Sequence, residues 1–128
     1  MGLLIVDKDK TARRVLADLL IEEGYDVTVT SSAAQALYDI LKKSAQVVLL
    51  GEEFDELRAA DLIPLLKQCR KDVNIILVSD KVPLPLIRKV RKEGIFYHAL
   101  RPLGAEGREE IRQAVRCALA SVQNCHSH

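Results

Sequence analysis

Short apolar runs alternate along this chain with amphipathic segments, and this alternation restricts the fold more than any other feature of the sequence. The runs Leu3–Val6, Gln46–Leu50 and Val73–Val78 are almost wholly apolar, as is typical of strands buried on both faces of a sheet. Tyr25–Thr30 alternates apolar and polar residues like an edge strand, and Ile95–Ala99 is a further short run. The sequence therefore predicts five short strands.

The segments between and after these strands have the periodicity of helices. Their apolar residues recur at steps of three and four, which places them on one face of a helix. The last helix is expected from about Ala105 to Val122. The predicted inward faces are Ala12, Val15, Leu16 and Leu19; Ala33, Ala36, Leu37, Ile40 and Leu41; Leu62, Leu65, Leu66 and Cys69; Leu84, Ile87 and Val90; and Ile111, Val115, Ala118, Leu119 and Val122.

Strands that alternate with helices in this way predict an α/β fold. Five of each form a three-layer sandwich, in which helices cover both faces of a five-stranded parallel sheet through right-handed crossovers. A chain of 128 residues has the length of a single domain. We place this domain at residues 1–123 and interpret residues 124–128 as a C-terminal tail.

The composition excludes several classes of function. A net charge of +1 gives no overall attraction to nucleic acid or membranes, and no apolar stretch approaches the ~20 residues that a membrane span requires. Cys69, Cys117 and Cys125 form neither an even set nor a close pair of metal ligands, which argues against a secreted disulfide framework. We expect a cytoplasmic protein.

Ligand sites of parallel sheets lie at the carboxyl ends of the strands, which directs attention to four loops. A dinucleotide or P-loop site needs clustered glycines in the first of these loops, and that loop has none. Nucleotide binding by those mechanisms is therefore not expected. The loops contain Asp7-Lys8-Asp9-Lys10, Gly51-Glu52-Glu53-Phe54-Asp55, Ser79-Asp80 and Arg101-Pro102.

Several short motifs stand in a characteristic order along the chain. They are Leu4-Ile5-Val6-Asp7, Gly24-Tyr25-Asp26-Val27, Ala36-Leu37, Val47-Val48-Leu49-Leu50, Ser79, Gly94 and Arg101-Pro102. Together they resemble the receiver domain of bacterial two-component response regulators over essentially the whole chain. The resemblance, rather than the hydropathy pattern, implies the flavodoxin-like strand order 2-1-3-4-5, for which a receiver is a standard example.

The resemblance also implies a role for each strand-end position. Receivers accept a phosphoryl group from a histidine kinase on an aspartate at the end of the third strand, and two acids after the first strand hold Mg²⁺. Asp7 matches the first acid, but Lys8 stands at the second and Gly51 stands at the phosphoacceptor position. Phosphoryl transfer needs a carboxylate nucleophile, and Mg²⁺ prefers carboxylate ligands. We therefore expect no phosphorylation at Gly51 and no Mg²⁺ cofactor.

Three further family positions are matched only in part. Ser79 fits the hydroxyl residue that contacts the phosphoryl group, and Arg101 replaces the lysine that pairs with it. His98 stands at the position of the switch aromatic, where we expect a hydrogen-bonded structural histidine. Because Lys8 and Arg101 already supply positive charge, we hypothesise that one of them pairs with Asp7 or Asp9 and locks the loops without phosphate.

These substitutions predict a degenerate receiver, or pseudo-receiver, that is not an enzyme. It would act in two-component phosphorelay signalling as a phosphorylation-independent protein-interaction or regulatory module. Two alternatives stay open. Glu52 or Asp55 could serve as a relocated phosphoacceptor, or an anion could be sensed between Lys8, Ser79 and Arg101.

Functional receivers signal mainly through the face formed by the fourth helix, the fifth strand and the fifth helix. A basic run on this fourth helix predicts docking of an acidic partner or a symmetric homodimer. The partner would be a signalling protein or the output domain of a longer regulator. Direct nucleic-acid binding is not expected, because no helix-turn-helix pattern is present. The basic run consists of Arg88, Lys89, Arg91 and Lys92.

Overall fold

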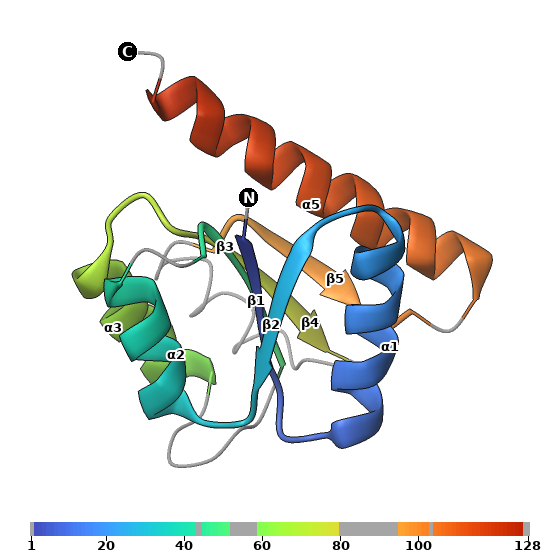
Figure 1. Cartoon of the computed structure of the whole chain (residues 1–128), viewed down its shortest axis with the longest axis horizontal. Coiled ribbons are helices and arrows are strands. Elements are labelled where there is room, and N and C mark those ends of the chain that lie inside the picture. Colours follow the sequence, from blue (N-terminus) through green and yellow to red (C-terminus); the bar gives the residue numbers. More distant parts are fainter. Residues whose placement is uncertain (1, 43–44, 52–58, 80–94, 103, 127–128) are drawn as a thin grey trace.

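A five-stranded parallel sheet forms the centre of the molecule (Figure 1). The computed structural model describes residues 2–42, 45–51, 59–79, 95–102 and 104–126, with side chains described as far as Ser121. The strand order is β2-β1-β3-β4-β5, which confirms the order that the resemblance implied. The strands are β1 (Gly2–Val6), β2 (Asp26–Thr30), β3 (Val47–Leu50), β4 (Asn74–Ser79) and β5 (Tyr97–Leu100).

Helices cover both faces of the sheet, as the alternating pattern predicted. In Figure 1, α2 (Ala33–Leu41) and α3 (Ala59–Cys69) lie on one side, and α1 (Lys10–Glu22) and α5 (Ala105–His126) lie on the other. The predicted fourth helix falls within residues 80–94, outside the described residues. None of the helices in the described part of the chain has the length and hydropathy needed to cross a membrane.

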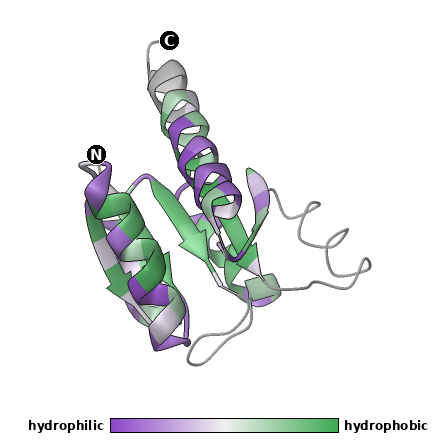
Figure 2. Ribbon diagram, turned by 90° about the vertical axis from the view of Figure 1, so that its right-hand side faces the viewer, coloured by the Kyte–Doolittle hydropathy of each residue, from purple (hydrophilic) through white to green (hydrophobic). Residues whose placement is uncertain are grey.

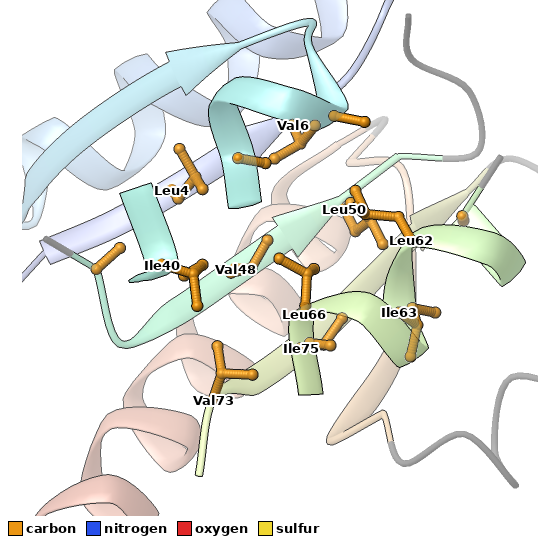
Figure 3. Close-up of a cluster of buried hydrophobic side chains, with 14 of the residues drawn as sticks. Leu4, Val6, Ile40, Val48, Leu50, Leu62, Ile63, Leu66, Val73 and Ile75 are labelled. Carbon is orange, nitrogen blue, oxygen red and sulfur yellow. The ribbon is translucent and has the colours of Figure 1, made fainter. Parts of the chain in front are cut away.

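Two apolar clusters hold the helices to the sheet. Successive residues of a strand point to opposite faces, so Leu4 and Val6 pack against α2 and α3 (Figure 3), whereas Leu3 and Ile5 pack against α1 and α5. Both faces of the central strands are therefore buried. Figure 2 shows an α5 ribbon of mixed hydropathy, as expected for a helix with one face on the sheet, beside strands that are largely hydrophobic.

Two predicted inward positions are wrong. Leu41 is 63% exposed, because it is the last residue of α2 and lies beyond the edge of the cluster. Leu65 is 36% exposed, and the neighbouring Ile63 is fully buried in its place. The face of α3 is therefore centred on Leu62, Ile63 and Leu66. This segment has so many apolar residues that steps of three and four connect them along more than one face of the helix. The sequence alone therefore does not identify the buried face.

The last helix is longer than predicted. It continues to His126, so residues 124–126, which we placed in a tail, are helical. No glycine or proline occurs between Val122 and His126 to end the helix. Val122, predicted to face inward, lies beyond the last described side chain.

Candidate functional site

The carboxyl ends of the strands bring the predicted site residues together. The Asp7 N–H donates to the Thr30 carbonyl of β2 at 3.1 Å, and the Gly51 N–H donates to the Val6 carbonyl of β1 at 2.8 Å. At the end of the neighbouring strands β4 and β5, the Arg101 N–H donates to the Ser79 carbonyl at 3.0 Å. These bonds extend the sheet ladders and fix the backbone of the site.

The carboxyl group of Asp7 lies where a side chain at position 51 would have to be. A Cβ atom added to Gly51 would stand 2.4 Å from both Cγ and Oδ2 of Asp7 and 2.9 Å from its Oδ1. Such distances are far inside van der Waals contact, which begins at about 3.5 Å between carbon atoms. The two residues are therefore complementary: this position of Asp7 requires a glycine at 51.

Asp7 is a buried and incompletely paired acid. Its side chain is 3% exposed, and its Oδ1 accepts a hydrogen bond from the Asp9 N–H at 3.0 Å. Its Oδ2 has no hydrogen-bond partner, since Nη2 of Arg101 stays 3.8 Å away. Burial raises the pKa of Asp7 above its ordinary value, although the Asp9 amide and the Arg101 charge act in the opposite direction.

Arg101 connects two loops that are distant in sequence. Besides facing Asp7, it places Nη1 3.2 Å from Oδ2 of Asp9. Asp9 is the N-cap of α1, where its side chain accepts from the Thr11 and Ala12 amides. Those amides, together with Arg101, lower the pKa of Asp9. The predicted ion pair is thus present for Arg101, and it joins the loop after β5 to the loop after β1.

Of the two cations that the hypothesis named, Arg101 forms the pair and Lys8 does not. Lys8 is exposed, and its side chain has no ion pair within the part of the chain that the structure describes. A cation that the sequence analysis missed, Arg13, fastens this loop instead. Its Nη1 donates to the Asp7 carbonyl at 2.6 Å and to the Lys8 carbonyl at 3.2 Å.

Ser79 and His98 form a pair of their own. Ser79 is fully buried, and its Oγ lies 2.7 Å from Nε2 of His98 on the neighbouring strand. The prediction of a hydrogen-bonded structural histidine is confirmed. The Ser79 hydroxyl, which in the family would contact a phosphoryl group, therefore has a partner within this chain.

Several predicted positions lie outside the described residues. They are the relocated phosphoacceptors Glu52 and Asp55 and the basic run Arg88, Lys89, Arg91 and Lys92. On the last helix, Arg112 pairs with Glu109 at 3.3 Å and with Glu23, just after the end of α1, at 3.0 Å.

Comparison with known proteins identifies the family. The family model for the response regulator receiver domain matches residues 3–116. The chain belongs to this family. The match includes Gly51 and all the other strand-end positions described above.

Curated relatives differ in how much of their length the receiver domain spans. It is 25% identical over 122 residues to sporulation initiation phosphotransferase F of Bacillus subtilis, covering 95% of this chain and 96% of that protein. It is 28% identical over 100 residues to the DNA-binding transcriptional regulator NtrC of Rhizobium meliloti, covering 78% of this chain but 21% of NtrC. With the response regulator protein TodT of Pseudomonas putida it shares 27% identity over 115 residues, covering 90% of this chain and 49% of TodT.

Solved structures show the same fold. The signal receiver domain of an HD domain-containing protein from Pseudomonas fluorescens superimposes with a TM-score of 0.86 at 23% identity, over 96% of this chain and 97% of that one. A CheY-like receiver domain from Methanospirillum hungatei gives a TM-score of 0.83 at 18% identity, over 96% and 97% of the two chains.

Proposed function

We propose that this receiver domain is a pseudo-receiver: a non-enzymatic interaction module of two-component signalling that acts without being phosphorylated. The observation that carries the proposal is the position of the Asp7 carboxyl group, which fills the space that a side chain at Gly51 would need. The nucleophile of ordinary receivers is missing here, and so is the room for it.

The charges around Asp7 support the same conclusion. Mg²⁺ requires several oxygen ligands in a near-octahedral arrangement. Asp7 and Asp9 both face the guanidinium group of Arg101, and a lysine stands at the second acidic position of the family. No group of three or more potential ligands occurs among the described residues. The donor set does not fit the ion, and we propose that the domain works without it.

The Arg101 bridge also supports a state that needs no phosphate. In the family, a lysine at this position pairs with the phosphoryl group, so the contact exists only after phosphorylation. Here the corresponding arginine has two carboxylate partners that belong to the chain. The loops after β1 and β5 are therefore joined without phosphate, in an arrangement that a partner could recognise.

The partner would be either a separate protein or an output domain in a longer chain. The relatives include both a protein that this domain nearly spans and regulators of which it covers a minor part. We propose a cytoplasmic signalling role in either case. Sensing of an anion between Lys8, Ser79 and Arg101 is not favoured, because Ser79 and Arg101 are already engaged.

Thermal unfolding with and without Mg²⁺ tests the proposal. A ligand present at 100 times its Kd stabilises a protein by about 2.7 kcal/mol, so a functional site would raise the melting temperature. We expect no change for the wild type. An ordinary receiver that retains both acids and its acceptor aspartate, measured in parallel, calibrates the size of a genuine response. A rise in the wild type's melting temperature at sub-millimolar Mg²⁺ would contradict the proposal.

A further inference from the structure

The charges of α1 run against the dipole of the helix. A helix N-terminus carries partial positive charge and favours acids, and a C-terminus favours bases. Apart from the N-cap acid Asp9, α1 has the opposite arrangement, with Lys10, Arg13 and Arg14 at its start and Glu22 at its end. Its first turn contains no acid, and its last turn contains no base. Helix stability therefore does not explain why the cations are at this end.

Internal ion pairs do not explain them either. Arg13 is engaged with two backbone carbonyls, but Lys8, Lys10 and Arg14 are exposed. None of these three side chains has a hydrogen bond or an ion pair in the described structure. We name these three residues the basic end of α1.

The members of this basic end lie on a fixed backbone. Lys10 and Arg14 are one helical turn apart and so share a face, and Lys8 precedes them in the loop. That loop is held by Arg13 from one side and by the Arg101–Asp9 pair from the other. Because the backbone is already ordered, a partner bound there would not need to order it.

We propose that the basic end of α1 is a docking surface for a short acidic segment of a protein partner. The inference rests on the proposed role as an interaction module and assigns a surface to it. Three exposed cations, one in the loop and two on the first turns of α1, form a field that attracts carboxylates. The partner's side chains would supply the charges that this surface lacks.

Two observations favour an acidic protein segment over nucleic acid. First, the backbone N–H groups of Thr11 and Ala12 at the helix start already donate to the Asp9 side chain. A phosphate therefore cannot use these two amides. Second, Asp18 and Glu22 are exposed further along α1 and would repel an extended polyanion.

Binding of a synthetic peptide rich in glutamate to the full chain tests the inference. Fluorescence anisotropy of the labelled peptide would be compared with that of the same peptide carrying glutamine in place of glutamate. We expect saturable binding of the glutamate peptide, weakened by added salt, and no binding of the glutamine peptide. The Lys10→Glu/Arg14→Glu variant should weaken binding about tenfold or more. Its acids suit the helix start, so it should fold at least as well as the wild type.

The matched control is Arg108→Glu/Arg116→Glu, which reverses two exposed cations on α5. It should bind the glutamate peptide with wild-type affinity. Equal loss of binding in both variants, equal binding of both peptides, absence of binding, or tighter binding of a short DNA duplex would each overturn the inference. Failure of the proposed function has a different signature, namely a gain of phosphoryl mass by the wild type, which does not depend on the peptide.

Discussion

At the scale of residues, the main feature of this site is the carboxyl group of Asp7, which stands where a Cβ atom of residue 51 would be. The carboxyl group of Asp7 is buried, and one of its oxygens lacks a hydrogen bond. Burial of an acid in such surroundings is unfavourable. The glycine and the acid therefore have to be considered as a pair, and substitutions at either position report on the other.

Gly51→Ala is expected to lower the free energy of unfolding by about 1–3 kcal/mol, the usual cost of an added group in a filled space. The added Cβ would collide with the Asp7 carboxyl group. In the Gly51→Ala/Asp7→Ala double variant the collision is absent, so the alanine at 51 should cost much less. Urea unfolding of the wild type, both single variants and the double variant measures this coupling. Additive effects would show that the two side chains do not compete for one space.

Asp7→Asn is expected to raise stability at pH 7. The pKa of Asp7 is raised in the folded protein, so the charged form costs stability above that pKa, and the cost disappears as the pH falls through it. The advantage of the variant should therefore shrink on acidification. The lowered pKa of Asp9 acts oppositely: its stabilisation is present above the ordinary value and is lost as the pH falls through the lowered one. That contribution is common to both proteins.

Urea unfolding of the wild type and of Asp7→Asn, from pH 7 down through the raised pKa of Asp7, provides the measurement. A variant that is less stable than the wild type at pH 7 would mean that the Asp7–Arg101 attraction outweighs burial.

At the scale of elements, Arg101 joins the loop after β5 to the start of α1. Arg101→Gln removes the charge that faces both Asp7 and Asp9. We expect a loss of about 1–3 kcal/mol in the free energy of unfolding, the usual range when a charged group loses its partner. The comparison is Arg108→Gln, an exposed change on α5 that should stay within about 0.5 kcal/mol. If both changes have equally small effects in urea unfolding, Arg101 does not hold the loops together.

Most elements could be predicted from the sequence, because buried strands and amphipathic helices leave clear periodicities. The buried face of α3 could not be predicted, because its apolar residues, Leu65 among them, lie on more than one face of the helix. The end of α5 could not be predicted either, because no glycine or proline marks it. In the site, the positions of Asp7, Ser79 and Arg101 at one edge follow from parallel strand order.

Other contacts of the site were not predictable. The bond from Arg13 to the loop carbonyls and the collision between Asp7 and a side chain at 51 depend on side-chain conformation. Sequence periodicity contains no information about it.

At the scale of the whole molecule, the fold and the site are separable. Both apolar clusters are built from strand and helix residues that alternate between the two faces of the sheet, and the site residues belong to neither cluster. A substitution at one of these strand-end positions therefore leaves both apolar clusters in place. This separation fits the close similarity of the fold to solved receivers, with TM-scores of 0.83 and 0.86.

The intact mass of the full chain after incubation with a small acyl phosphate and Mg²⁺ shows whether the domain accepts a phosphoryl group. An ordinary receiver with its acceptor aspartate, treated in parallel, confirms that the donor is active. We predict that the mass of the wild type is unchanged, because Gly51 offers no nucleophile and Asp7 fills the space beside it. A mass gain of one phosphoryl group, at Glu52, Asp55 or any other acid, would contradict the account and show that the domain is still a phosphoacceptor.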